Sequence, residues 1–478
     1  MVEEKDLWEH QKRCIHAATE QKDLALFLDA GVGKTAIAIN ILRNHFRISK
    51  TVKSTLILAP IVVLKQWKDE FAKFSNIPQH QIFVCYGTGA KRTDQIKDAI
   101  ASTLGDCIII TNYETILMTP AILELLNWRP EIFILDESHR CKSPTSKRSR
   151  KAMMIADRAK HKYLLTGTPM TNSPMDIYSQ YRIMDGGETF GDNFYVFRSI
   201  WFDNIMANTR ATFPKFVMKP GKVEEMNRLI YKKAMRAVKS ECLDLPPLIK
   251  TKIEVPLSQE QKRLYNEMRM HFITYVDSDH SDQPQAVIAS QAMVKALRMQ
   301  QIVTGFVKTE EGETIRVKDN PRIKALKELL EDLCIGHKVI VWNTFKENYA
   351  QVRDVCKELK LEYAELHGDI TDKQGQVESF RNDPKVRVMI AHPQAGGIGV
   401  NLVEASYMIY YSKGFNLEQD IQSEARNFRA GSERHDKITR IDLVSPGTID
   451  ELVNEALENK QNIIENIMSL RNQLDLDI

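Results

Sequence analysis

The sequence predicts an α/β protein made of two doubly wound parallel-sheet lobes with helical insertions. Short apolar runs alternate with amphipathic segments of helix length in both halves of the chain, which is typical of parallel strands joined by helices. The chain has 478 residues, more than a single hydrophobic core usually serves, so two lobes are expected. Polar turns follow several of the apolar runs, at the strand ends where open α/β sheets bind ligands.

Composition is that of a globular protein and leaves the partners open. Hydrophobic residues make up 43% of the chain and charged residues 27%, which excludes a disordered protein. The net charge of +3 neither requires nor excludes nucleic acid, so local clusters must decide. Seven scattered cysteines without metal-binding spacing indicate reduced thiols in an intracellular protein. No apolar run approaches the ~20 residues that span a bilayer, and we expect no membrane association.

A phosphate loop is predicted between the apolar run 24–28 and the helical segment that follows it. Glycines let backbone N–H groups approach phosphates, and the helix offers its positive N-terminus. Lys34 is expected to reach the β- and γ-phosphates, and the Thr35 hydroxyl to ligate Mg²⁺. Because Leu28 occupies the position of the usual first glycine, a glycine-rich turn without nucleotide is the alternative. The expected ATP-binding residues of the loop are Gly31, Val32, Gly33, Lys34 and Thr35.

Gln11 precedes this loop by about twenty residues, on a predicted amphipathic helix. A glutamine amide donates and accepts at once, so it can read the edge of adenine. A solvated helix position is the alternative. The phosphate loop downstream favours the adenine role.

Two more apolar strands of the first half end in candidate contact residues. The strand 55–59 stops at Pro60, and the strand 106–111 runs through Thr111 into a polar loop that begins at Asn112. Because both turns lie at carboxyl ends of strands, they are candidates for ligand contact.

Two adjacent carboxylates, Asp136 and Glu137, follow the apolar run 132–135. Asp136 is expected to hold Mg²⁺ and Glu137 to polarise the attacking water. The alternative is a charged strand end facing solvent, which the upstream phosphate loop disfavours. The densest basic run of the chain, 140–151, comes next, and it is either a solvated loop or a contact to phosphate backbone. The candidate contacts are Arg140, Lys142 and Lys147.

Six segments occur in the order of the motifs of helicase superfamily two, DEAH/DESH-box type. They are Gln11, 31–35, 58–60, 111–114, 136–139 and 164–169. Three passages, 56–74, 164–172 and 393–431, make the chain resemble more narrowly the Swi/Snf branch of double-stranded-DNA translocases, in a compact single-motor form. The resemblance implies two RecA-like lobes, ATP and Mg²⁺ as cofactors, and double-stranded DNA as partner. It also implies that Thr166 and Thr168 couple the ATP and DNA sites, that Gly397 contacts DNA and that Gln422 contacts ATP.

Arg426 and Arg429 are the strongest signal in the second half. They are three residues apart, so we expect both to project from one helix face. A guanidinium aimed at the γ-phosphate stabilises the transition state and can contribute about 10³–10⁵ in rate. A surface helix with salt bridges is the alternative. Since the phosphate loop lies in the first half, hydrolysis is expected to require closure of the lobes.

The break at Pro246 and Pro247 marks the predicted lobe boundary. We predict an N-terminal RecA-like ATP-binding lobe at 1–244 with a helical protrusion at about 175–240, and a C-terminal RecA-like helicase lobe at 245–478 with a helical insertion at about 257–335 and a brace helix at about 448–474.

The predicted function is an ATP-dependent motor that tracks along double-stranded DNA and remodels protein–DNA or branched DNA structures. Its catalytic set is Lys34, Asp136, Glu137, Arg426 and Arg429. A strand-separating or branch-migrating helicase on the same framework is one alternative. An inactive DNA-binding scaffold is another, which the intact catalytic set disfavours. We expect a monomer that is cytoplasmic if bacterial or phage and nuclear if eukaryotic.

Overall fold

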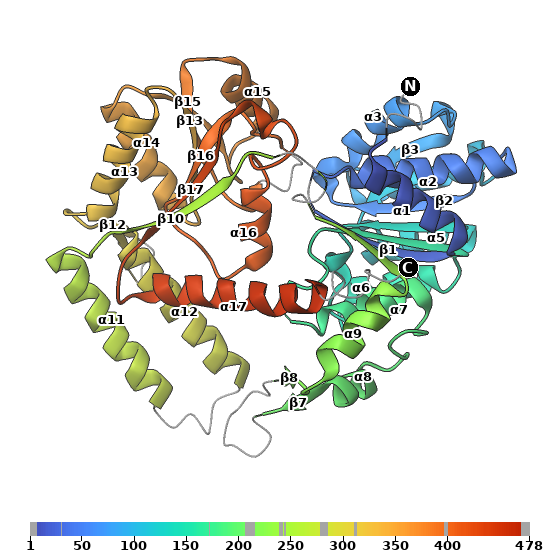
Figure 1. The fold of residues 1–478 in the computed structure, drawn as a ribbon, viewed down its shortest axis with the longest axis horizontal. Coiled ribbons are helices and arrows are strands. Elements are labelled where there is room, and N and C mark those ends of the chain that lie inside the picture. The colour runs from blue at the N-terminus through green and yellow to red at the C-terminus, as the bar shows by residue number, and fades with distance from the viewer. Residues whose placement is uncertain are drawn as a thin grey trace. The chain divides into compact units, whose positions relative to one another are not determined.

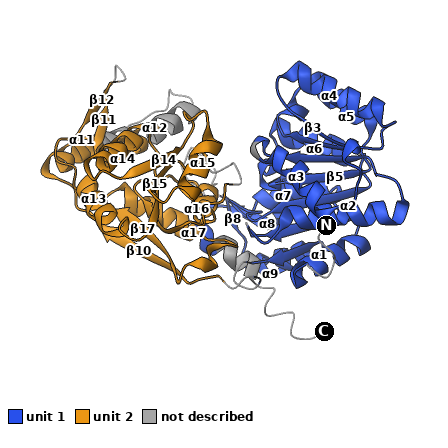
Figure 2. Ribbon diagram, turned by 90° about the horizontal axis from the view of Figure 1, so that it is seen from above, with its two compact units in different colours: residues 1–205, 215–244, 460–478 blue, residues 206–214, 245–459 orange. Residues whose placement is uncertain are grey.

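The computed structural model divides into two compact units (Figure 2). Unit 1 comprises residues 1–205, 215–244 and 460–478, and unit 2 comprises residues 206–214 and 245–459. The structure describes residues 7–29, 31–171, 173–205, 216–238, 242, 245–277, 285–309, 313–395 and 400–469.

Unit 1 is built on a parallel sheet of seven described strands, in the order β3-β4-β2-β5-β6-β1-β9 (Figure 1). The strands are β1 (Asp23–Leu28), β2 (Thr55–Ala59), β3 (Ile82–Cys85), β4 (Ile108–Asn112), β5 (Ile132–Asp136), β6 (His161–Thr166) and β9 (Ala234–Ala237). Alternate residues enter two separate apolar cores, as Phe27 and Leu58 do on one face and Leu26 and Ile57 on the other. The central strands β2 and β5 are almost wholly apolar because helices cover both faces.

The helices of unit 1 follow the strands in alternation. They are α1 (Glu9–Glu20), α2 (Lys34–Ser49), α3 (Leu64–Phe74), α4 (Gly89–Ser102), α5 (Thr119–Trp128), α6 (Lys147–Ala156), α7 (Asp176–Asp185), α8 (Phe194–Trp201) and α9 (Lys222–Tyr231), with short 3₁₀ turns at Ile61–Val63, Gln79–Gln81, Thr115–Leu117 and Ser138–Cys141. Helices α1 to α3 bury their apolar residues in one core, and α4 to α9 in the other. The sheet is therefore wound on both sides.

The span 175–240 is not purely helical. Besides α7, α8 and α9, it contains an antiparallel pair, β7 (Phe202–Asn204) with β8 (Phe216–Met218), and the strand β9. β9 pairs in parallel with β1 and extends the main sheet. Helical spacing could not predict this, because a four-residue strand owes its state to its partner strand rather than to its own pattern.

Unit 2 repeats the plan with a parallel sheet of six described strands, in the order β10-β17-β16-β13-β15-β14. The strands are β10 (Leu248–Glu254), β13 (Lys338–Trp342), β14 (Glu362–Leu366), β15 (Val386–Ala391), β16 (Ala405–Tyr410) and β17 (Ile438–Val444). Val339 and Val341 enter one core, and Ile340 and Trp342 the other. The predicted fold class, two doubly wound parallel-sheet lobes, is confirmed.

The remaining elements follow in chain order, and the last of them, α17, belongs to unit 2 only up to residue 459. They are α11 (Gln259–Asp277), α12 (Gln285–Val303), the antiparallel pair β11 (Phe306–Lys308) and β12 (Thr314–Arg316), α13 (Pro321–Leu333), α14 (Lys346–Glu358), α15 (Lys373–Asn382), α16 (Leu417–Glu424), a 3₁₀ turn at Ser432–Arg434, and α17 (Ile449–Ser469). Among the helices that the structure describes, none has the length and apolarity needed to cross a membrane.

Candidate functional site

The predicted phosphate loop joins β1 to α2 in unit 1. Gly31 and Gly33 adopt φ values of +96° and +89°, in a region that L side chains rarely occupy. A Cβ atom at Gly33 would meet only the end of the flexible Gln11 side chain, so the positive φ, rather than lack of space, is what favours glycine there. Gly33 caps α2, which begins at Lys34, so free backbone N–H groups and the positive helix end face the loop. This geometry suits an anion such as a phosphate.

Gln11 lies against the loop rather than open to solvent. Its Nε2 donates to the Val32 carbonyl oxygen at 3.4 Å, and its Oε1 accepts from the Trp8 backbone N–H at 3.1 Å. The ring nitrogen Nε2 of His10 lies 2.9 Å from the same Val32 oxygen. Residues of α1 therefore hold the loop from behind.

A pocket of about 270 Å³ opens beside these residues, between the start of α1 and the end of β9. Its walls include the half-exposed Trp8 ring and the guanidinium groups of Arg13 and Arg236. An aromatic face with cations suits a flat heteroaromatic ring. Sequence reasoning missed these three residues, although Trp8 stands only three positions before Gln11.

The carboxylate pair lies at the end of β5, and Lys34 reaches it. Asp136 Oδ2 accepts a hydrogen bond from Trp67 Nε1 at 2.9 Å, and its backbone oxygen accepts one from the Tyr113 hydroxyl at 2.7 Å. Glu137 Oε1 lies 3.7 Å from Lys34 Nζ, which also donates to the Leu28 carbonyl at 3.1 Å. Glu137 itself has φ +56°, a left-handed conformation unusual for a non-glycine residue. The structure thus brings together the predicted catalytic residues of unit 1.

The electrostatics of this pair favour an additional cation. Burial, with the negative charge of Glu137, raises the pKa of Asp136 to about 6, against the opposing effects of the Trp67 hydrogen bond and Lys34. Two carboxylates therefore share one ammonium group. Oxygen donors are the ligands that Mg²⁺ prefers, so Asp136, together with the Thr35 hydroxyl at the start of α2, is a chemically suitable set.

A hydrogen-bonded chain connects the carboxylates to the end of β6. Nδ1 of the buried His139 lies 3.4 Å from Glu137 Oε2 and 3.0 Å from the Thr166 hydroxyl. That hydroxyl accepts from the Thr168 backbone N–H at 3.1 Å. Both predicted coupling residues therefore connect to Glu137 through His139, which sequence reasoning named in a motif without giving it a role.

The predicted DNA contacts on the strand ends differ in accessibility. Thr111 is fully buried, and its hydroxyl donates to the Cys85 carbonyl at 2.9 Å, so any role of Thr111 at a DNA interface is indirect. Asn112 Oδ1 accepts from Arg92 Nη1 at 2.6 Å, and Arg92 was not among the predicted residues. Pro60 is buried at the end of β2. Gly397 lies outside the described residues.

The basic run begins on a short 3₁₀ turn and continues into α6. Arg140 and Lys147 are exposed, while Lys142 donates to the Thr171 hydroxyl. The neighbouring Arg148 pairs with Glu114 at 2.6 Å. Both outer residues, Arg140 and Lys147, are therefore accessible to a polyanion.

In unit 2, the expectation that Arg426 and Arg429 project from a helix is wrong. α16 ends at Glu424, and both arginines lie in the turns that follow. The physical reason is that the segment after α16 forms hydrogen bonds with the chain around the start of β16. The Arg426 carbonyl accepts from the Leu402 N–H at 2.9 Å, and the buried Asn427 donates to the Ala405 carbonyl at 3.1 Å. Gln422 does lie on α16, where it donates to Glu418 at 3.2 Å.

A buried ion cluster fixes α16 against the sheet. Arg440 on β17 contacts Asp420 and Glu424 of α16, each at 2.8 Å, and Asp442 at 3.0 Å. Lys413 joins the cluster through Asp442 at 2.6 Å, and Lys250 joins it through Glu424 at 2.8 Å. Although burial raises the pKa values of Glu424 and Asp442, the nearby cations, Arg440 first, hold both below their ordinary values. The start of the arginine-bearing segment is therefore anchored.

Comparison with known protein families shows which family this chain belongs to. Residues 10–306 match the SNF2-related domain, and residues 321–431 match the helicase conserved C-terminal domain. The chain belongs to the SNF2-related family. The family that the motifs indicated is thereby confirmed.

Relatives of this family member come from eukaryotes and from a phage. The CHD3-type chromatin-remodeling factor PICKLE of Arabidopsis thaliana is 24% identical over 94% of this chain and 33% of its own length. The putative protein p41 of Acyrthosiphon pisum secondary endosymbiont phage 1 is 25% identical over 95% of this chain and 96% of its own length. This chain thus spans a third of the plant protein and nearly all of the phage protein. Among solved structures, the Sulfolobus solfataricus SWI2/SNF2 ATPase core in complex with dsDNA is 23% identical with a TM-score of 0.45, over 97% of this chain and 93% of that one.

Proposed function

We propose that this SNF2-related protein is an ATP-hydrolysing motor that acts on double-stranded DNA. The observation that carries the proposal is the meeting of Lys34 and Glu137 at the N-terminus of α2, next to the buried Asp136. Membership of the SNF2-related family supports it, because relatives bear names such as chromatin-remodeling factor and chromodomain-helicase-DNA-binding protein.

Each residue of the unit 1 site has its own proposed role in phosphoryl transfer. The loop N–H groups and Lys34 bind the phosphates, and Lys34 exchanges its contact with Leu28 for them. Asp136 and Thr35 would hold Mg²⁺, and the ion would supply positive charge that stabilises phosphoryl transfer. Glu137 orients and polarises the attacking water, and His139 fixes the Glu137 carboxylate. Trp8, Arg13 and Arg236 line the pocket proposed for the base.

In unit 2, the proposed role of Arg426 and Arg429 is to stabilise charge on the γ-phosphoryl group, with Gln422 as an accompanying ATP contact. The role proposed for these two arginines rests on the sequence motif that contains them and on membership of the SNF2-related family. The anchored helix α16 supports it, because a guanidinium acts well only from a fixed segment.

The proposed DNA contacts are the accessible residues of the basic run, Arg140 and Lys147, with Lys142 and Asn112 nearby. Pro60 and Gly397 stay predictions from the motif order. If about four to six phosphates are neutralised, log affinity should fall against log salt with a slope of about −0.9 per phosphate. We propose that the protein acts as a monomer inside the cell, in the cytoplasm for a phage or bacterial protein and in the nucleus for a eukaryotic one.

The experiment is a steady-state ATPase assay without nucleic acid, with single-stranded DNA, and with blunt duplex. We expect blunt duplex to stimulate hydrolysis most, and Glu137→Gln to reduce the stimulated rate by about 10²–10⁴. Glu378→Gln, which removes an exposed carboxylate of α15, is the matched control and should keep the rate. A preference for forks or single strands would favour a strand-separating helicase. Hydrolysis that is unaffected by Glu137→Gln on every substrate would contradict the proposal, and no hydrolysis at all would favour the scaffold.

A further inference from the structure

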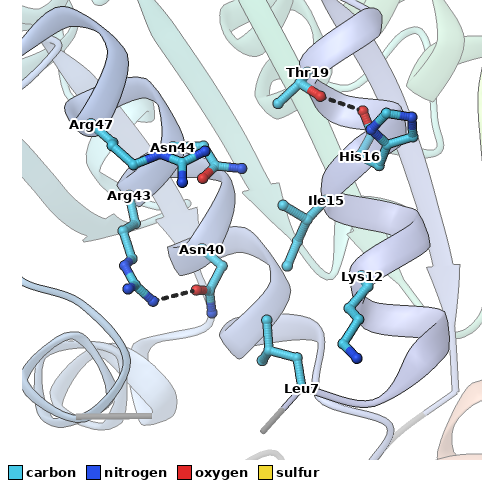
Figure 3. A pocket seen from close by; sticks show the side chains of 9 residues that line it. All are labelled: Leu7, Lys12, Ile15, His16, Thr19, Asn40, Arg43, Asn44 and Arg47. Carbon is cyan, nitrogen blue, oxygen red and sulfur yellow. Dashed lines mark hydrogen bonds between the residues drawn. The ribbon is translucent and has the colours of Figure 1, made fainter. Parts of the chain in front are cut away.

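A groove in unit 1, between helices α1 and α2, is lined by several cationic side chains (Figure 3). It has a volume of about 190 Å³, and within the described part of the chain its nine lining residues include neither Asp nor Glu. Three of them, Lys12, Arg43 and Arg47, carry permanent positive charge, and His16 is a fourth basic group. We refer to it as the α1–α2 groove.

The basic residues are spaced so that they face the same space. Lys12 and His16 are four residues apart on α1, as are Arg43 and Arg47 on α2, so each pair shares a helix face. Like charges at this spacing oppose each other. Among the described residues, no carboxylate lies within 4 Å of Arg47. On α1, Lys12 pairs with Glu9 at 3.8 Å and His16 with Glu20 at 3.4 Å, and both pairs are exposed.

A buried side chain fixes the orientation of one basic residue in the wall of the groove. Asn40 is only 5% exposed, and its Nδ2 donates to the Ala36 carbonyl at 2.8 Å. Its Oδ1 accepts from Arg43 Nη1 at 3.3 Å and so orients the guanidinium (Figure 3). An arginine held in this way loses little conformational entropy on binding, and its fork matches phosphate oxygens.

We propose that the α1–α2 groove binds a small phosphate-bearing anion of about the size of pyrophosphate. Since a water molecule occupies about 30 Å³, the cavity holds one or two phosphoryl groups and is too small for a duplex. The anion would bridge Lys12 on α1 to Arg43 and Arg47 on α2. Because α1 holds the phosphate loop through His10 and α2 starts at that loop, the bound anion would brace the ATP site from outside.

The test separates this groove from the phosphate loop. In a Lys34→Ala protein, which lacks the loop cation, pyrophosphate and inorganic phosphate are titrated by calorimetry at constant ionic strength. We expect saturable binding of pyrophosphate, weakened at least about ten-fold by adding Arg43→Gln and Arg47→Gln, because each removes a charge-assisted hydrogen bond. Lys65→Gln with Lys68→Gln, two exposed lysines of α3, removes the same charge and should leave binding unchanged.

Hydrogen exchange gives the location of binding. Pyrophosphate should slow exchange in residues 9–20 and 34–49, and the single exposed Arg47→Gln should weaken this protection even if the double variant folds poorly. No saturable binding to the Lys34→Ala protein, or equal weakening by the α3 control, would overturn the proposal. Binding of a short duplex without binding of pyrophosphate would overturn it as well. None of these outcomes depends on ATP hydrolysis.

Discussion

Each unit contains a buried cluster of charged side chains. Both clusters combine carboxylates with cations, but they differ in the balance of negative and positive charge. In unit 1, Asp136 and Glu137 share the single ammonium group of Lys34, and the pKa of Asp136 rises to about 6. In unit 2, three cations, Arg440, Lys413 and Lys250, meet three carboxylates, and the pKa values of Glu424 and Asp442 fall. Burial acts in the same direction in both clusters, so the balance of nearby charges makes the difference.

This difference separates a functional cluster from a structural one. A buried carboxylate with a raised pKa costs folding free energy, which proteins tolerate where an outside cation or substrate is to be bound. Carboxylates with lowered pKa values are already satisfied by their neighbours and hold elements in place. We therefore propose metal and nucleotide chemistry for the Asp136 pair and the positioning of α16 for the Arg440 cluster.

The largest expected change in the free energy of unfolding follows from disrupting the unit 2 cluster. Arg440→Met leaves buried carboxylates on α16 and β17 without their main cation, and removing one partner of a buried pair costs about 3–5 kcal/mol. Hydrogen exchange in β16 and β17 under mild urea should show this destabilisation. Lys346→Met breaks an exposed pair with Asp369 and should leave the unfolding free energy almost unchanged. Equal effects of both variants would mean that the cluster is not structural.

A smaller change in the free energy of unfolding, of opposite sign, is expected when Asp136 is replaced. Because its folded pKa of about 6 exceeds the ordinary value of 3.8, the stability that it contributes is complete below pH 4 and is lost as the pH rises through 6. The shift corresponds to about 2–3 kcal/mol. Asp136→Asn should thus equal the wild type in unfolding free energy near pH 4 and exceed it at pH 7.5, while hydrolysis is lost. A wild type that is more stable at pH 7.5 would contradict the assignment.

The sequence predicted the parts of both clusters that local patterns determine. The phosphate loop and the carboxylate pair each follow an apolar strand, so the motif places Lys34 and Glu137 at one edge of the sheet. What it could not predict depends on partners far along the chain. Trp67 donates to Asp136 from 69 residues away, and Asn427 bonds to Ala405 and helps to end α16 before the arginines. Arg440 gave no sequence signal, because a single arginine in a strand has no pattern.

The smallest expected effect concerns the basic run, whose exposed charges belong to neither cluster. Arg140→Gln and Lys147→Gln should each lower the slope of log affinity for duplex against log salt by about 1, without a preference for DNA sequence. Fluorescence anisotropy at several salt concentrations measures the slope. Lys373→Gln on α15 is the control and should leave it unchanged. Unchanged slopes in all three variants would assign the DNA contacts to other residues.

The most direct test of the central claim is the Mg²⁺ dependence of nucleotide binding. The dissociation constant of a non-hydrolysable ATP analogue is measured with Mg²⁺ and with a chelator, for the wild type and for Asp136→Asn. Because burial and the charge of Glu137 disfavour the ionised form of Asp136, a bound cation would stabilise that form. We therefore expect Mg²⁺ to tighten binding to the wild type by at least about ten-fold and to have little effect on the variant. The same Mg²⁺ dependence in both proteins would contradict the assignment of Asp136 to the metal.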